Sequence, residues 1–194
     1  MLNKLAKVIR VITIPPFMVA ILLTLLYFLD DVFPSTLDFV LELFFLAIVP
    51  VLAYPVQKLI PRLAKGGRKT QRNMAFVFSF VGYGGAVVCS ILRNAIPNLL
   101  YVSVVYFGSV VLLTLLNCLT PWHASGHACS ISGPILLICL FIGNFAILGG
   151  VLLFLAALWA SLYMKRHTLL EFGLGVLCAF LSALITYFLI HPVF

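Results

Sequence analysis

The sequence predicts an all-α fold: a polytopic membrane helix bundle of about six to seven transmembrane helices, forming one integral membrane domain over residues 1–194. Of the 194 residues, 64% are hydrophobic and only 9% are charged. The mean hydropathy is +1.23. A soluble domain of this length needs a polar surface that these residues cannot supply. The apolar residues form continuous segments, which favours helices over an alternating β-barrel pattern.

Seven apolar segments of about 14 to 22 residues are long enough to be helices in a bilayer core of ~30 Å, and they cover 8–29, 37–58, 74–92, 99–119, 129–142, 145–163 and 169–190. The first carries Pro15 and Pro16 and is long, so we interpret it as a retained helix and not as a cleaved signal peptide. The fifth is short, which favours a tilted helix or one that ends below the far surface. Gly143 and Asn144 form the turn between the fifth and the sixth.

The order of the helices places the breaks after the second, fourth and sixth on the same face as the N-terminus. This face collects eleven of the twelve Lys and Arg residues, whereas Arg93 lies on the other face, near Asp30, Asp31 and Asp38. Because cytoplasmic loops carry the excess of basic residues, we expect this face to be cytoplasmic. The membrane that we expect is the plasma membrane of a bacterium. The net charge of +7 is then a topology signal, and the sequence offers no soluble domain for binding nucleic acid.

Two of the breaks on this face carry unusual polar residues. In KGGRKTQRN, Lys65 and Arg72 are separated by six residues, and the other basic residues of this break are typical of contacts with anionic lipid headgroups. In HASGHA, the fifth helix begins near Ser125 and Gly126, whose small side chains let an anion approach the free N–H groups of a helix start. Ser125 is equally suited to be a plain N-cap. His127, in the first turn, is costly to desolvate and is therefore a candidate for function.

The third break contains HTLLE, in which His167 and Glu171 are four residues apart and share one helix face. A carboxylate beside an imidazole fixes its tautomer and raises its basicity, as a nucleophilic or general-base histidine requires. The alternative is an interfacial His/Glu pair that only ends a helix.

In order and spacing these segments resemble the three signature motifs of the type 2 phosphatidic-acid phosphatase family of lipid phosphatases. The first motif, K-x6-R-P, corresponds to Lys65 and Arg72, and the second, P-S-G-H, to residues 124–127. The third, S-R-x5-H-x3-D followed closely by a glycine, corresponds to His167, Glu171 and Gly175. The resemblance covers residues 65–175, and the two helices within 1–60 lie outside it.

The chain departs from the family pattern at several positions. The prolines of the first two motifs are absent, and Glu171 replaces an aspartate while keeping its charge. Ser161 stands where the third motif has an arginine that helps to neutralise the transferring phosphoryl group. Lys165 and Arg166 are the two residues that we expect to supply the missing charge.

The resemblance implies a phosphatase that needs no cofactor or metal ion. His167, oriented by Glu171, would attack phosphorus and form a phosphohistidine. His127 would protonate the leaving oxygen and then activate water. Lys65, Arg72 and the backbone at Ser125 and Gly126 would hold the phosphate oxygens, with Lys165 or Arg166 in support.

The expected substrate is an amphiphile with its phosphate at the interface and its tail between helices. A phospholipid phosphate and a polyprenyl phosphate or diphosphate both fit, and membrane lipids are the other expected partners. Two alternatives remain open: a lipid-binding or scaffold protein that has lost turnover, which Ser161 favours, and a small lipid or anion transporter with a basic gate.

Overall fold

The computed structural model describes residues 2–190, and within them the side chains of all residues except 68–69 and 144–146. Every described element is helical, which confirms the predicted all-α bundle. The elements are α1 (Leu2–Ile12), α2 (Pro15–Leu29), α3 (Thr36–Leu43), the π-helical turn η1 (Phe44–Ile48), α4 (Val49–Leu59), α5 (Pro61–Ala64), α6 (Gly67–Leu92), α7 (Pro97–Leu119), α8 (Gly126–Ile142), α9 (Asn144–Tyr163) and α10 (Leu169–Ile190).

The long helices have the length and composition of membrane spans. Four qualify within residues 2–190: Thr36–Leu59, Thr70–Leu92, Pro97–Leu119 and Leu169–Ile190. The bent pair α1 and α2 would make a fifth if it acts as one span. The remaining two predicted segments correspond to shorter apolar helices, Gly126–Ile142 and Ile147–Tyr163. The molecule is therefore an integral membrane protein, and some of its helices are too short to cross the bilayer by length alone.

The first predicted helix, 8–29, is wrong as a continuous element, because the chain bends by 55° between α1 and α2. Ile14 precedes Pro15 and has extended dihedrals, φ −67° and ψ 148°. A residue before proline is driven out of the helical region, and proline itself has no N–H to return to the preceding turn. The pair Pro15–Pro16 therefore ends α1 and begins α2 in a new direction.

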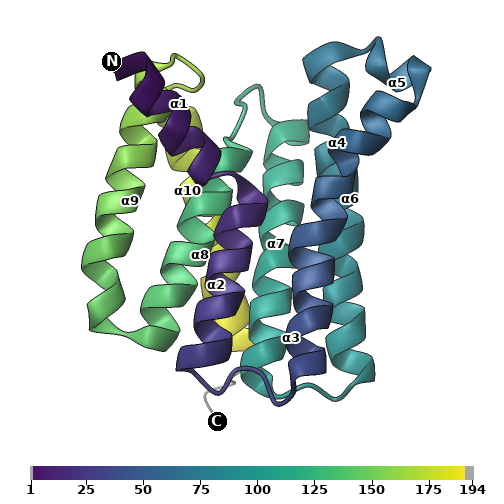
Figure 1. Ribbon diagram of the computed structural model, residues 1–194, viewed down its shortest axis with the longest axis vertical. Helices are drawn as coiled ribbons and strands as arrows, with labels where there is room; N and C mark the ends of the chain where they lie inside the picture. Colours follow the sequence, from purple (N-terminus) through teal and green to yellow (C-terminus); the bar gives the residue numbers. More distant parts are fainter. Residues whose placement is uncertain (1, 191–194) are drawn as a thin grey trace.

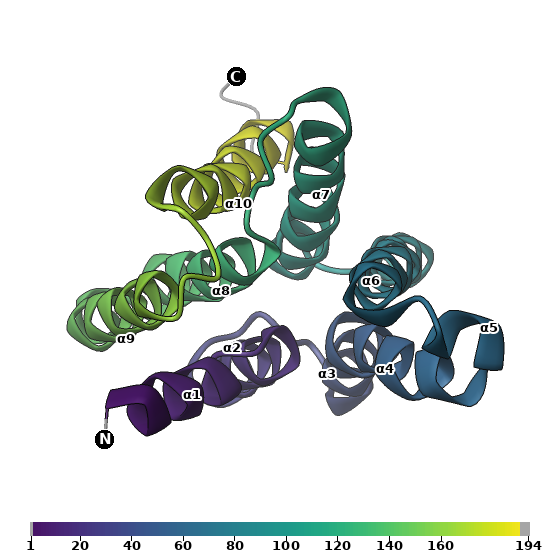
Figure 2. The same cartoon turned by 90° about the horizontal axis from the view of Figure 1, so that it is seen from above.

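Figure 1 shows the three predicted polar breaks and the N-terminal helix at one end of the bundle, while α10 ends at the other. Seen along the bundle, α1, α2, α3 and α4 form one row that faces α9, α8 and α6 (Figure 2). Helix α10 packs on α7 and α8, behind this pair of rows. The arrangement agrees with the sidedness derived from the sequence: the basic breaks share a face with the N-terminus.

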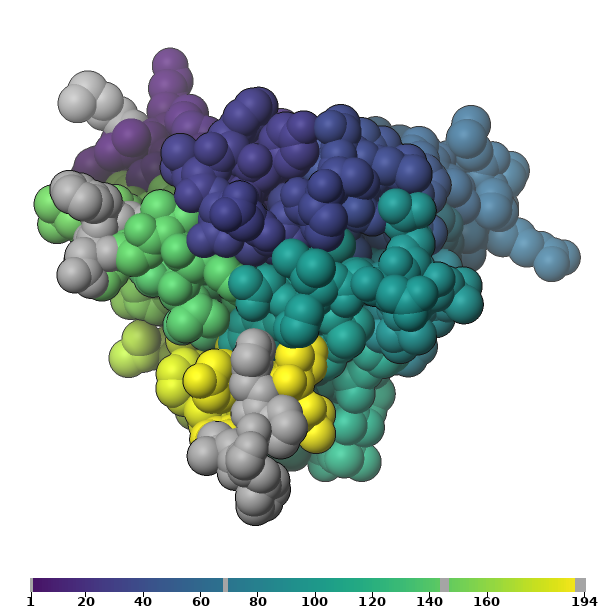
Figure 3. Space-filling view, turned by 90° about the horizontal axis from the view of Figure 1, so that it is seen from below, coloured from purple at the N-terminus to yellow at the C-terminus, as the bar shows by residue number. Residues whose placement is uncertain are grey.

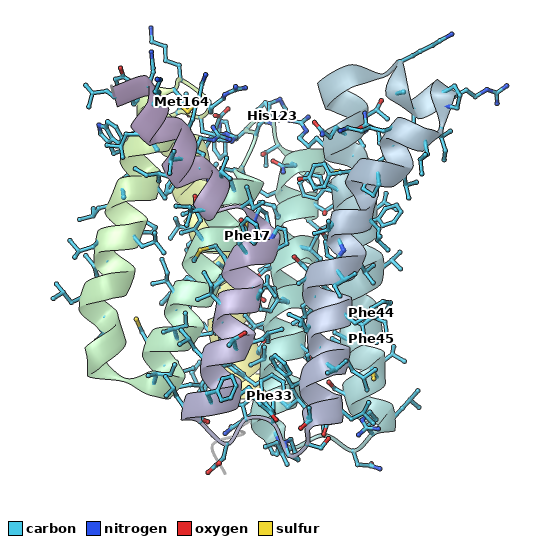
Figure 4. All side chains as sticks on the ribbon, in the orientation of Figure 1. Phe17, Phe33, Phe44, Phe45, His123 and Met164 are labelled. Atoms are coloured by element: carbon cyan, nitrogen blue, oxygen red, sulfur yellow. The ribbon has the colours of Figure 1, made fainter. Side chains whose placement is uncertain are left out.

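The largest cluster of buried apolar residues extends toward the opposite end of the bundle. Figure 3 shows the molecule from that end. Fully buried residues there come from the second half of α2, from η1 and from the start of α7, and include Leu22, Leu26, Leu46, Leu99 and Val102. Figure 4 shows Phe33 at this end and Phe44 and Phe45 higher on the flank.

A buried carboxylate also joins helices in the opposite half. Glu42, only 3% exposed, accepts hydrogen bonds from Ser90 at 2.9 Å and from Ser103 at 2.8 Å. Arg93 closes this end with an ion pair to Asp38 at 2.7 Å. These contacts tie α3 to α6 and α7.

Candidate active site

A cavity of about 620 Å³ begins at the end of the bundle that carries the three breaks and continues between the helices. It is lined by α1, α4, α6, α7, α8, the α7–α8 connection and the α9–α10 connection. Both candidate histidines, His127 and His167, line it, and so does His123 at the rim (Figure 4). The sequence assigned His123 no role.

The second predicted segment forms the start of α8. Ser125 is its N-cap: the side-chain oxygen accepts the N–H of Ala128 at 3.2 Å. The backbone N–H of Ser125 donates to the carbonyl oxygen of Glu171 at 2.8 Å. Ser125 is fully buried and is therefore committed to structure, whereas Gly126 and His127 line the cavity from the first turn of α8. An anion at this helix start would meet the N–H groups of Gly126 and His127 and not that of Ser125.

The third predicted segment forms the start of α10. Thr168 and Glu171 make a capping box: the Thr168 N–H donates to Glu171 Oε2 at 2.9 Å, and the Glu171 N–H donates to Thr168 Oγ1 at 3.2 Å. The same Oε2 lies 3.4 Å from Nδ1 of His167, close enough for an ion pair. This buried Nδ1 forms no hydrogen bond with the residues that the structure describes. Glu171 thus both caps the helix and faces the histidine. A role at the helix end and a role beside a functional histidine are therefore compatible.

Gly175 brings the second and third segments together. A Cβ atom at this position would overlap the Ser125 carbonyl oxygen and would come within 3.0 Å of the Ala128 Cβ atom. Only a glycine lets α10 approach α8 this closely, and the approach permits the bond between Ser125 and Glu171. The glycine that follows the third motif is therefore needed for packing.

The cations divide into two groups. Arg72, on α6, and Arg166, in the α9–α10 connection, line the cavity. Lys65 is exposed beside α5, away from α8 and α10, and does not line it (Figure 1). The geometry supports Arg72 as a phosphate-binding residue and gives Lys65 no contact with the cavity. The side chains of Arg68 and Lys69 lie outside the described ones.

The end of α9 explains why Lys165 and Arg166 differ. The N–H of Lys165 donates to the Leu162 carbonyl, and that of Arg166 donates to the Ser161 carbonyl, which is the pattern of a Schellman motif. Lys165 occupies the left-handed position, with φ 49°. The turn directs Lys165 to a separate open depression near Asn3, whereas Arg166 also reaches the cavity.

Two polar residues at or beside the site come from the N-terminal bend, which lies outside the segment that resembles the family motifs. Arg10, in the last turn of α1, lines the cavity. Thr13 is fully buried; its hydroxyl donates to the Ile9 carbonyl at 2.8 Å and lies 3.3 Å from Nε2 of His127. A hydroxyl has one proton, so Thr13 accepts a hydrogen bond from a protonated Nε2 while it donates to Ile9. The proline pair was the available signal, because a bend there turns α1 back over the bundle end.

Burial sets the charge state of His167. It lowers the pKa of this ring below its ordinary value. The nearby Glu171 carboxylate raises the pKa in part, and the positive charges of Arg10 and Arg72 lower it further. His167 is therefore mainly neutral at neutral pH, as a nucleophile must be. Among residues 2–190, no three His, Cys, Asp or Glu side chains lie together as a metal site.

Comparison with known proteins gives no relative: no family model, no curated protein and no solved structure matches this chain. The family resemblance stays a prediction, and function has to be argued from the cavity.

Proposed function

We propose that the protein is a membrane lipid phosphatase that hydrolyses a phosphomonoester or diphosphate of a lipid through a phosphohistidine. The observation that carries this proposal is the meeting of His127 and His167, from two distant segments, with Arg72 and Arg166 in one cavity. A neutral imidazole, a second imidazole and guanidinium groups are the parts that phosphoryl transfer to histidine needs.

In the first step Nε2 of His167 attacks phosphorus, an N–P bond forms, and the P–O bond to the lipid breaks. The leaving oxygen takes a proton from His127. In the second step His127 accepts a proton from water, and the hydroxide attacks phosphorus and breaks the N–P bond. The products are the lipid alcohol (or the monophosphate from a diphosphate) and inorganic phosphate. Arg72 and Arg166 neutralise the oxygens as their charge grows.

The shape of the cavity supports an amphiphilic substrate. From Asn117 to Val105 on α7 it follows twelve residues, which corresponds to ~18 Å of helix. Its inner part is lined by Val105, Leu137 and other residues in the middle of the bundle. A phosphate among the arginines would therefore leave room for an apolar chain below it. Phospholipid phosphates and polyprenyl phosphates are both candidate substrates.

The direct test is phosphate release by the purified protein from a panel of lipid phosphates, with and without EDTA. Rapid quenching without acid, after mixing with radiolabelled substrate, should trap phosphohistidine. His167→Ala should abolish the adduct, whereas His127→Ala should slow its hydrolysis and let it accumulate. An adduct that persists in His167→Ala would contradict the assignment of the nucleophile. Tight binding of lipid phosphates without any turnover would favour the scaffold alternative.

A further inference from the structure

The N-terminal helix brings a positive charge into the cavity. Arg10 is half-buried, and its Nη1 atom is fully buried without a hydrogen-bond partner among the described residues. A buried N–H donor without an acceptor is unfavourable, since it has lost its contact with water and gained no hydrogen bond in return. Its position therefore points to a ligand that supplies the acceptor.

The groups around Arg10 make that ligand an anion. Its charge acts on the rings of His127 and His167, and Arg166 is close enough to repel it. Helix α1 contains no acidic residue, and the Glu171 carboxylate accepts the Thr168 N–H and faces His167. Like charges held together in a partly desolvated cavity need a counter-charge.

The packing of α1 explains how Arg10 reaches the cavity. Helix α1 packs on α9, and both helices carry small, fully buried residues: Ala6 on α1 and Ala160 and Ser161 on α9. A long side chain at position 161 would need space that this packing occupies. The Ser161 hydroxyl is buried, has no hydrogen-bond partner in the described part of the chain and does not line the cavity.

We propose that Arg10 is a substrate-binding residue that contacts the phosphate oxygens, so that the bend at Pro15 delivers a cation from outside the motif segment. This inference rests on the proposed function of the cavity. Arg10 presents a planar fork of N–H donors, which suits two oxygens of one phosphate group. Thr13 is the positioning residue of the same bend, because it holds His127 at 3.3 Å.

The test compares Arg10→Ala, Arg10→Lys and the control Lys7→Ala, since Lys7 is exposed on the same helix and does not line the cavity. Arg10→Ala should lower kcat/KM by about 100-fold, as loss of one preorganised donor does. Arg10→Lys should recover only part of it, because an ammonium group keeps the charge and lacks the fork. Lys7→Ala should stay within about twofold of the wild type, the small effect expected of an exposed charge that salt screens.

Orthovanadate binding, followed by its shift of the melting temperature, gives a second readout without turnover. The shift should be smaller in Arg10→Ala and unchanged in Lys7→Ala. Arg10→Met, which keeps the buried aliphatic stem, replaces Arg10→Ala if the latter does not fold.

The two ideas fail in different ways. Wild-type turnover together with an unaffected Arg10 variant would overturn the role of Arg10 and leave the phosphatase standing. Absence of wild-type turnover would refute the phosphatase. In that case equal vanadate binding by wild type and Arg10→Ala would overturn the anion site as well, and weaker binding by the variant would support it.

Discussion

Glu171 has two roles that can be separated by substitution. Its Oε2 atom accepts the Thr168 N–H at 2.9 Å and faces His167 Nδ1 at 3.4 Å. Glutamine keeps an acceptor for the capping box and removes the charge, whereas alanine removes both. Loss of such a cap costs ~1 kcal/mol of stability. We therefore expect Glu171→Gln to melt near the wild-type temperature and Glu171→Ala to melt lower.

The effect on turnover should follow the charge and not the cap. Replacing the buried aspartate of a serine-protease triad by asparagine lowers kcat by ~10⁴. The Glu171 pair is longer and both side chains are 26% exposed, so its contribution is smaller. We expect both variants to lower kcat on the order of 10²-fold, with nearly equal losses in kcat.

The pH dependence of kcat/KM tests the direction in which Glu171 shifts the pKa of His167. The carboxylate raises the pKa of His167 against the lowering effect of burial. Removing its charge in Glu171→Gln lowers that pKa further, so the acid limb of kcat/KM should move to lower pH. Full activity with an unmoved acid limb in Glu171→Gln would refute a link between Glu171 and His167, and would reduce Glu171 to a helix cap.

Three other predictions test the packing of α10 on α8, the phosphate-binding residues and the orientation of the protein in the membrane. Gly175→Ala should destabilise the protein by about 1–3 kcal/mol through overpacking against α8, whereas a methyl group in Gly173→Ala meets nothing within 4 Å and should leave the melting temperature nearly unchanged. Arg72→Ala should lower kcat/KM by ~10²-fold as a lost phosphate donor, and Lys65→Ala should have a much smaller effect; equal losses would indicate a diffuse basic surface. In a variant without the native cysteines, Arg62→Cys should react with a membrane-impermeant thiol reagent only after the cells are opened. Labelling in intact cells would show that the orientation is the reverse of the predicted one.

The helices could be predicted from hydropathy because a membrane span must be apolar along its whole length. Their ends could not, since backbone hydrogen bonding continues into polar residues. Helix α6 begins at Gly67, although the apolar segment begins only at 74. The bend before Pro15 was readable in principle, because two successive prolines cannot return hydrogen bonds to the turn before them.

The site was predictable where chemistry and local spacing coincide. His167 and Glu171 face each other as predicted, but not from one helix face, because His167 lies in the α9–α10 connection and only Glu171 lies on α10. The Thr168 capping box is a local pattern of the same kind, since the sequence T-L-L-E places a glutamate three residues after a threonine. Arg10 could not be found in this way, because its place depends on the packing of α1 against α9, two helices far apart in the sequence.

The bundle separates stability from the site along its length. Far from the polar breaks, Leu22, Leu26 and Val102 are fully buried, and Glu42 joins three helices through hydroxyl groups. Near the breaks the chain keeps a cavity and a buried Arg10 Nη1 atom that has no hydrogen-bond partner among the described residues, and both features reduce stability. A marginally stable protein tolerates such features only when other regions compensate for them. The well-packed half of the bundle therefore supplies the stability that the half with the cavity lacks. The Arg10 charge then remains available to an anionic ligand, whose binding would supply the contacts that folding left unmade.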